Sequence, residues 1–450
     1  MRPIDETVRL AVALPAMVLL AAGCAGDADA GSGDDEGSEP GPAASGPVAS
    51  QGAVDCDADD GGLELPDGFC ARVVARGVGA ARHIAVDAGG DLYVALREDG
   101  EDRPGGVVAL RDTTGDGRAD VRETFGGGGG TGVALRDGWL YFGADGRILR
   151  WHLREGELAP SGSPEVVVSD LPSERSHAAK PIVFDGQGDL FVNVGSPSNS
   201  CQEEDRAAES PGMDPCPELE TRAGIWRFDA DATGQTQADG QRFATGMRNT
   251  VALALGPDGT LHGVIHGRDQ LGQNWPDLFT VEESARKPSE EFVRITEGAD
   301  YGWPYCYHDP QLDEKVLAPE YGGDGREVGR CADKDDPLVA FPAHWAPDGL
   351  HFYTADQFPP EYRGGAFIAF HGSWNRAPEP QAGYKVVHVP FRDGRPTGEW
   401  EEFATGFREP GQGPRDADHR PVGLAQGPDG SLYVTDDQAG WIWRIMREGG

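Results

Sequence analysis

The sequence has few lysines, no long hydrophobic run and no extended stretch with the apolar period of a helix. Only five of its 39 basic residues are lysine, against 76 acidic residues, and the formal net charge is −37. Such an acidic chain argues against nucleic acid or an anionic membrane surface as the main partner. Without a sustained 3.6-residue period, the 450 residues are not expected to be mainly helical.

Missing motifs exclude two common redox cofactors. The chain has no CxxCH sequence, so it carries no attached c-type haem. The glycine run at 126–130 is not followed by a helical pattern, which excludes the dinucleotide fingerprint of nicotinamide enzymes. Its 66 glycines and 34 prolines instead favour many short strands joined by turns.

The N-terminal segment has the features of an export signal. Residues 10–22 form an apolar run that follows two arginines and is too short to span a bilayer stably. The run ends in LAAGC, which resembles a bacterial lipoprotein box, so we predict a signal peptide at 1–23 and lipidation of Cys24. An ordinary secretory signal is the alternative. Residues 24–60 lack lysine and arginine and are predicted to be a disordered acidic tether.

The six remaining cysteines predict disulfides, because an exported chain with an even number of cysteines forms them. Six cysteines allow 15 pairings, but these occur as three pairs of sequence neighbours. Zinc is a poor alternative, because no two of them have the short spacing of a zinc knuckle. The predicted bonds are Cys56–Cys70, Cys201–Cys216 and Cys306–Cys331.

A strand pattern recurs six times between residues 61 and 450. Each copy is a short apolar strand, a Gly/Asp turn and an alternating strand. At about 65 residues per copy the repeats are longer than a compact propeller blade, so we predict an all-β, six-bladed β-propeller with long inter-blade loops. An open β-sandwich is the alternative. The copies lie at 84–96, 133–151, 182–195, 253–267, 349–373 and 424–445.

Most repeats carry a cation or a histidine where the chain enters the innermost strand. Active sites of propellers lie where such entries converge near the central axis. An acidic chain that places its scarce cations there is therefore predicted to bind an anion; the alternative is that each cation pairs with a surface carboxylate. The residues concerned are Arg82, His177, Lys180, Arg248, Arg420, Arg376 and Lys385, with His344 entering the fifth repeat.

Specific strings in these repeats resemble the soluble glucose/sorbosone dehydrogenase family of pyrroloquinoline-quinone-dependent six-bladed propellers. They are SHAAKPIVFD around His177, GMRNT around Arg248, HGSWNR at 371–376 with GYKVVHVPF at 383–391, and RPVGL at 420–424. The resemblance covers residues 68–444, nearly the whole predicted domain. Residues 178–180 differ from the usual family sequence after the histidine, which concerns the substrate rather than the cofactor.

This resemblance implies roles for individual residues. Pyrroloquinoline quinone is a planar tricarboxylate and needs several cationic donors. His177 would be the base that takes the substrate's hydroxyl proton, with a structural loop histidine as the alternative, while Arg248 and Asn249 would stabilise the reduced quinone. Calcium beside the quinone would act as a Lewis acid. The cofactor-binding cations implied are Arg248, Lys385 and Arg420, with Arg82, Arg376 and Lys180 as further candidates.

A second calcium site is predicted at residues 112–123. The segment matches a calcium loop at positions 1, 5, 6, 9 and 12, and Gly117 supplies the sharp turn. Thr114 stands where an aspartate or asparagine is usual. A plain Asp/Gly turn is the alternative. The predicted ligands are Asp112, Asp116, Asp120 and Glu123.

Together these features predict an exported quinoprotein, lipid-anchored in the bacterial cell envelope. It would oxidise a sugar-type alcohol or aldehyde by hydride transfer to pyrroloquinoline quinone and pass electrons to an external acceptor. Its membrane contact would be the N-terminal lipid alone, and no nucleic-acid partner is expected. A non-enzymatic propeller that binds a ligand or a protein on its axial face is the first alternative. A lactonase-type hydrolase is the weakest, because the axial entries carry cations.

Overall fold

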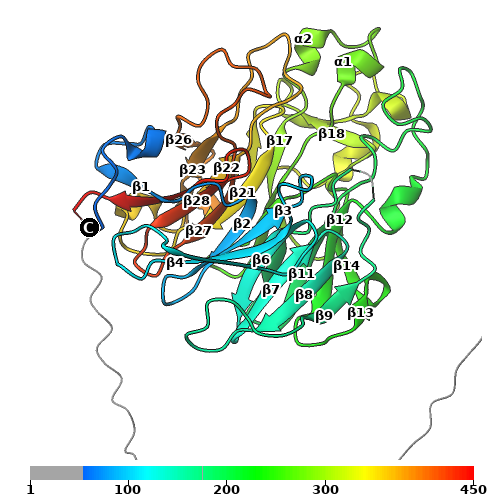
Figure 1. Cartoon of the computed structure of the whole chain (residues 1–450). Helices are drawn as coiled ribbons and strands as arrows, with labels where there is room; N and C mark the ends of the chain where they lie inside the picture. Colours follow the sequence, from blue (N-terminus) through cyan, green and yellow to red (C-terminus); the bar gives the residue numbers. More distant parts are fainter. Residues whose placement is uncertain (1–53, 175, 450) are drawn as a thin grey trace, which may run out of the picture. The chain divides into compact units, whose positions relative to one another are not determined.

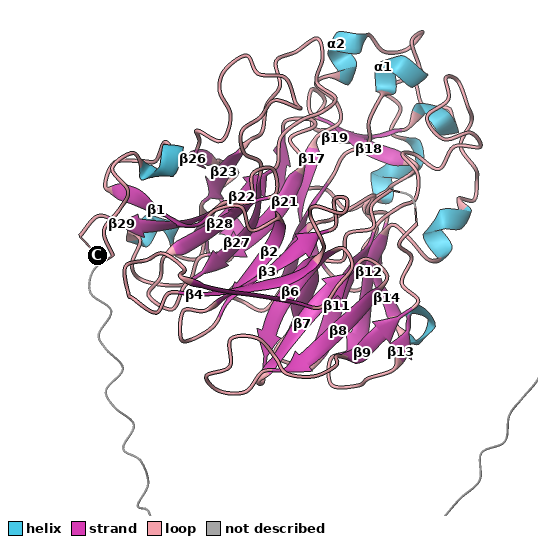
Figure 2. Ribbon diagram, in the orientation of Figure 1, coloured by secondary structure: helices cyan, strands magenta, loops and turns pink. Residues whose placement is uncertain are grey.

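A computed structural model describes residues 54–174 and 176–449 of the chain. The chain divides into two units, Met1–Ser50 and Gln51–Gly450. The second unit is built almost entirely of strands, with helices confined to short turns in the loops (Figure 2). Six antiparallel sheets of four strands follow one another along the chain, the second with one added strand. The predicted six-bladed β-propeller is confirmed.

The first three blades are consecutive along the chain (Figure 1). The short β13 joins the second blade in parallel with β9. Their strands are β2 (Ala80–Val86), β3 (Leu92–Arg97), β4 (Gly106–Arg111) and β5 (Val121–Phe125); β6 (Gly130–Arg136), β7 (Trp139–Ala144), β8 (Arg147–His152), β9 (Glu165–Ser169) and β13 (Gln235–Thr236); and β10 (Ile182–Phe184), β11 (Asp189–Val194), β12 (Gly224–Asp229) and β14 (Gln241–Thr245).

The last three blades follow the same plan, except that the sixth takes its outer strand, β1, from the N-terminal side. Their strands are β15 (Ala252–Leu255), β16 (Leu261–Ile265), β17 (Glu290–Ile295) and β20 (Val339–Phe341); β21 (Pro347–Phe352), β22 (Ala366–Phe370), β23 (Lys385–Val389) and β26 (Glu401–Ala404); and β27 (Pro421–Gln426), β28 (Leu432–Asp436), β29 (Ile442–Arg447) and β1 (Phe69–Ala75).

The long loops contain the remaining regular structure. Two small hairpins are β18 (Cys306–Asp309) with β19 (Glu314–Leu317), and β24 (Phe391–Arg392) with β25 (Arg395–Pro396). The α-helical turns are α1 (Leu271–Asn274) and α2 (Val281–Ser284). The 3₁₀ turns are η1 (Asp60–Gly62), η2 (Pro217–Glu220), η3 (Gln237–Asp239), η4 (Pro319–Tyr321), η5 (Gly329–Asp333) and η6 (Pro360–Tyr362).

The repeated Gly/Asp turns join the two innermost strands of a blade. Between β2 and β3, the Asp87 carboxylate accepts hydrogen bonds from the backbone of Gly89 and Asp91. Gly90 has a φ of +91°, a conformation that only glycine adopts without strain. Asp185 repeats both bonds in the third blade. In the fourth and sixth blades, Asp258 and Asp429 each accept one bond from the backbone two residues further on.

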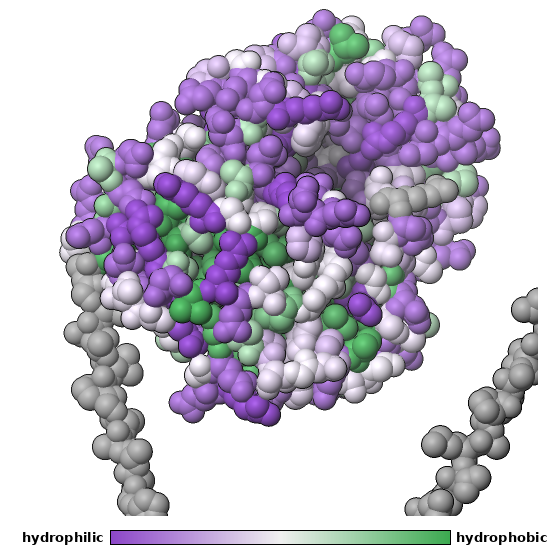
Figure 3. Space-filling model, in the orientation of Figure 1, coloured by the Kyte–Doolittle hydropathy of each residue, from purple (hydrophilic) through white to green (hydrophobic). Residues whose placement is uncertain are grey.

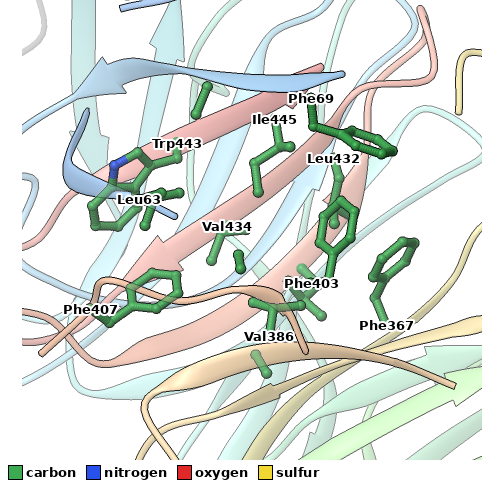
Figure 4. Packing of buried hydrophobic residues seen from close by; sticks show 14 of the residues in the cluster. Leu63, Phe69, Phe367, Val386, Phe403, Phe407, Leu432, Val434, Trp443 and Ile445 are labelled. Carbon is green, nitrogen blue, oxygen red and sulfur yellow. The ribbon is translucent and has the colours of Figure 1, made fainter. Parts of the chain in front are cut away.

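Closure of the ring depends on β1, which pairs antiparallel with β29 from Phe69 opposite Arg447 onward. Phe69 packs edge-on against Phe358 and Phe403, at centroid distances of 4.8 and 5.1 Å (Figure 4). These rings belong to a buried apolar cluster that joins the fifth and sixth blades. Because burying aromatic surface is strongly favourable, this cluster holds the N-terminal strand β1 against the last two blades.

Residues 54–60, predicted to belong to the tether, pack against the propeller instead. The Asp57 carboxylate accepts a hydrogen bond from the Val73 backbone at 2.9 Å and forms ion pairs with Arg72 and Arg118. The three predicted disulfides are confirmed as Cys56–Cys70, Cys201–Cys216 and Cys306–Cys331. The signal peptide, Cys24 and the rest of the tether lie outside the described residues. Within the described part, no helix is long and apolar enough to cross a membrane.

Candidate active site

The inner strands of the six blades, β2, β6, β10, β15, β21 and β27, lie next to one another around the axis. Four of them show a register shift near their first residues, where they begin to pair with the next strand. Such bulges re-aim side chains and are frequent beside active sites. The shifts at β2 and β21 contain Arg82 and Asp348, which therefore face each other across the axis at 3.1 Å.

His177 lies between β9 and β10 with a φ of +59°, which is rare for a residue with a side chain. Its Nδ1 lies 2.7 Å from the Ser196 carbonyl oxygen, so Nδ1 carries the proton and Nε2 keeps its lone pair. Burial, together with the positive charge of Arg248, holds the pKa of His177 well below its ordinary value. The imidazole is therefore neutral at neutral pH and can accept a proton at Nε2.

Gly195 brings His177 and Asn249 together. A Cβ at this position would lie 2.5 Å from the His177 Cβ and 2.9 Å from the Asn249 Oδ1, both too close for any larger residue. The next residue, Ser196, donates its backbone N–H to the Arg248 carbonyl oxygen at 2.8 Å. The structure thus brings the three predicted catalytic residues into one cluster.

The Arg248 side chain is buried, and each of its three guanidinium nitrogens has a hydrogen-bond partner. It donates to the carbonyl oxygens of Asn199 and Gly267 and forms an ion pair with Asp269 at 3.0 Å. Burial opposes ionisation of Asp269, but Arg248 and His344 outweigh it and hold the pKa of this carboxyl well below its ordinary value. Asp269 is therefore an anion that already balances the charge of Arg248.

Arg420 precedes β27 and is 1% exposed. Its guanidinium hydrogen-bonds only neutral groups, which include the carbonyl oxygens of Gly372 and Pro414. Its Nη1 lies 3.2 Å from the His371 Nδ1, and its Nη2 lies 3.2 Å from the Tyr384 hydroxyl. The indole of Trp374 covers the guanidinium at 4.0 Å. The Arg420 Nε is buried without a hydrogen-bond partner. A buried cation in such surroundings favours an added anionic ligand.

The Arg248 and Arg420 sites are connected by consecutive residues of the loop after β22. Trp374 stacks on Arg420, and the side-chain amide of Asn375 donates to Asp269 at 3.1 Å. On the side where the loops near β17 and β18 gather, the surface shows a recess surrounded by hydrophilic residues (Figure 3). The site is thus a polar axial cluster shared by several blades.

Buried carboxylates at the axis were missed by the sequence analysis. Arg82 donates to Asp437 at 2.9 Å and forms a second ion pair with Asp348. Asp348 also meets His266 at 3.2 Å, and Asp437 meets His371 at 2.8 Å. Arg82 does lie at the axis, but two anions already balance its charge. The signal was available, because Asp348 stands directly before the fifth repeat and Asp437 lies within the sixth, just after β28.

Three of the cations predicted to bind the cofactor already have other partners. Lys385 faces the outer part of its blade, where it forms an ion pair with Glu402. Lys180 lies in the same loop as His177, is fully buried and donates to the Ala178 carbonyl oxygen at 2.6 Å. Arg376 donates to the carbonyl oxygens of Ala343 and Pro380, and so closes its own loop.

The predicted calcium loop at 112–123 uses its carboxylates within the loop. Asp112 accepts hydrogen bonds from the backbone of Gly115 and Gly117, and Asp120 accepts from Thr113. Glu123 lies on β5, opposite Ala109. Asp116 accepts from the Arg118 backbone. These contacts match the Asp/Gly-turn alternative.

One compact group of three possible metal ligands occurs among the described residues, and it does not support a metal either. Cys201, Cys216 and Glu218 lie close together, but the two cysteines form a disulfide.

The chain is thus a six-bladed propeller that gathers a neutral histidine and buried arginines at its axis. Residues 63–448 match the TrAA12-like family, and the chain belongs to that family.

Two curated relatives match parts of the chain. An uncharacterized protein of Borreliella burgdorferi is 31% identical over 208 residues, covering 46% of this chain and 48% of that protein. A pyrroloquinoline quinone-dependent pyranose dehydrogenase of Coprinopsis cinerea is 28% identical over 269 residues, covering 51% of this chain and 35% of that enzyme. The matches thus span less than half the length of either relative.

Solved structures share the fold over nearly the whole domain. The holo pyrroloquinoline quinone domain of pyranose dehydrogenase from Coprinopsis cinerea has a TM-score of 0.69 at 21% identity, covering 86% of this chain and 97% of that one. A calcium structure of a family AA12 enzyme from Trichoderma reesei has a TM-score of 0.69 at 22% identity with the same coverage. The pyrroloquinoline quinone-bound aldose sugar dehydrogenase of Streptomyces coelicolor has a TM-score of 0.52 at 18% identity, covering 85% and 99%.

Proposed function

We propose that this protein is a pyrroloquinoline-quinone-dependent oxidoreductase that oxidises a sugar-type alcohol or aldehyde. The observation that carries the proposal is Arg420, a buried guanidinium whose contacts are with neutral groups, in a chain with 76 acidic residues. A buried cation that hydrogen-bonds only neutral groups is costly, and a bound carboxylate lowers that cost. The chemical class of the ligand and of the substrate is taken from the TrAA12-like family and its pyrroloquinoline-quinone-dependent relatives.

The residues present fit a planar polycarboxylate. Arg420 offers a buried Nε without a partner, and the adjacent Trp374 offers an indole face to a flat ring system. Asn249 contributes an amide beside the base, and Arg248 a guanidinium. These groups would hold the quinone, which supplies the hydride-accepting carbonyl carbon when it is bound. We no longer include Lys385 among them, because its ammonium group is paired with Glu402.

The chain itself performs the proton chemistry. His177 presents a neutral Nε2 because Nδ1 is fixed by the Ser196 carbonyl oxygen. That nitrogen would take the proton of the substrate's hydroxyl as its carbon loses hydride. Arg248, held by Asn199, Gly267 and Asp269, would keep its guanidinium rigid near the developing negative charge.

Other parts of the proposal concern the setting of the reaction. The substrate would be an aldose or related sugar, and electrons would leave to an external acceptor. Calcium would assist beside the quinone as a Lewis acid. The protein would be exported and anchored in the cell envelope through a lipid on Cys24.

A non-enzymatic propeller that binds a ligand on the same face is the second candidate. It is favoured by the fact that Arg82, Arg248 and Lys385 are already paired with carboxylates. The lactonase alternative is weakened, because the axial carboxylates Asp348 and Asp437 are committed to Arg82 rather than open to a metal.

Titration of the apoprotein with pyrroloquinoline quinone and calcium separates these candidates. The proposal expects saturable binding and reduction of a dye in the presence of an aldose. Replacing His177 by glutamine should lower turnover by about 10²- to 10⁴-fold while cofactor affinity stays within about threefold. His152→Gln, on the exposed end of β8, is the control and should leave both unchanged. Cofactor binding without turnover on any aldose would support the second candidate.

A further inference from the structure

His371 lies between Asp437, one of the buried carboxylates at the axis, and Arg420, the residue on which the proposed function rests. It follows β22 directly, and its two ring nitrogens face groups of opposite charge. Nδ1 lies 3.2 Å from the Arg420 Nη1, and Nε2 lies 2.8 Å from the Asp437 Oδ1. Arg420 and Asp437 are 1% and 2% exposed, so both contacts are shielded from water.

These two contacts fix the tautomer of the ring. A guanidinium has only N–H donors, so the nitrogen that it approaches must accept. Nδ1 of His371 therefore carries no proton, and the proton is on Nε2, where it is donated to the Asp437 carboxylate. Burial disfavours the charged carboxylate, but His371 and Arg82 outweigh it and hold the pKa of Asp437 below its ordinary value. Asp437 is thus a permanent acceptor near neutral pH.

We propose that His371 is a positioning residue that orients Arg420 toward the anionic ligand through the Asp437–His371–Arg420 chain. This inference rests on the proposed function, since the ligand is the quinone's carboxylate. The Asp437 carboxylate holds the imidazole proton on Nε2, and the free Nδ1 anchors one Nη of Arg420. The Arg420 Nε, which has no hydrogen-bond partner, is left for the ligand.

The first test reads the tautomer in the apoprotein. Nitrogen-15 chemical shifts of labelled histidine, with the His371 signal assigned by its loss in His371→Gln, should show Nδ1 unprotonated and Nε2 protonated at pH 7.5. A proton on Nδ1 at that pH would overturn the inference, whatever the ligand.

The second test measures the affinity for pyrroloquinoline quinone by calorimetry at pH 8. His371→Gln keeps an acceptor and a donor and should bind within about threefold of the wild type. His371→Phe removes both and should bind at least about tenfold more weakly. His152→Gln is the control and should follow the wild type.

The outcomes are distinguishable from those of the proposed function. A loss of affinity in His371→Gln as large as that in His371→Phe would overturn the positioning role while leaving cofactor binding by the wild type intact. Equal affinity of His371→Phe and the wild type at pH 8 would do the same. No binding by the wild type at any pH would overturn the proposed function and this inference together.

Discussion

Replacing Arg420 by methionine is expected to weaken cofactor binding while leaving folding stability almost unchanged. Methionine keeps much of the apolar length of the arginine stem but removes its charge and its donors. Losing one partner of a buried, charge-assisted pair typically costs about 2–4 kcal/mol. That range corresponds to an increase of the cofactor's dissociation constant of about 30- to 1000-fold.

The effect on folding has two opposing parts. The guanidinium is buried against Trp374 and hydrogen-bonds His371, Tyr384 and the carbonyl oxygens of Gly372 and Pro414. None of these partners is charged, so removing the guanidinium relieves a desolvation cost. The groups that it bonds lose their donor, at about 1 kcal/mol each. The two contributions largely cancel, and the unfolding free energy should change by no more than about 1 kcal/mol.

Two measurements check this pair of expectations. Calorimetric titration gives the dissociation constant, and urea unfolding of the apoprotein gives the stability. Arg136→Met is the control, because Arg136 pairs with Asp231 on the surface and should affect neither quantity by more than about 0.5 kcal/mol. The reasoning fails if Arg420→Met binds as tightly as the wild type, or if it unfolds several kcal/mol more easily.

Two further substitutions test a buried charge and a loop that is closed by a disulfide bond. Burial lowers the pKa of Lys180 to about 7, so the unfolded chain binds more protons than the folded one between about pH 7 and pH 10. Wild-type stability should therefore rise with pH across that window, and Lys180→Met should flatten this rise in urea unfolding; an unaltered slope would contradict the assignment. Replacing Cys306 and Cys331 together by serine should lower the free energy of unfolding by about 2–4 kcal/mol, because their bond closes a 25-residue separation. A melting temperature equal to that of the wild type would refute this loss.

The blades could be predicted from the sequence because each repeat contains the Asp and Gly residues that form its own turn. Asp87 and Gly90 determine their hairpin through local contacts, and the same pattern recurs in other blades. The contribution of β1 could not be read in this way. Phe69 pairs with Arg447 across almost the whole chain, and no local pattern encodes such a partner.

The site was predicted in part, for a related reason. Loop positions near the axis identified His177, Arg248 and Arg420, which the structure brings to the axial cluster. Their partners were not predictable, because ion pairs such as Arg82 with Asp437 join residues 355 positions apart. Lys385 illustrates a second limit. Its neighbour Tyr384, which precedes β23 with a φ of +52°, contacts Arg420, whereas Lys385 begins β23 and faces Glu402.

The pairing of β1 with β29 also constrains the order in which the protein can mature. A ribosome completes β29 last, so five blades can form while the sixth still lacks its third strand and cannot offer an edge to β1. The apolar cluster that contains Phe69 and Trp443 can therefore be completed only after β29 is available. Closure of the ring is a late step of folding, because β1 has no strand to pair with until β29 is in place.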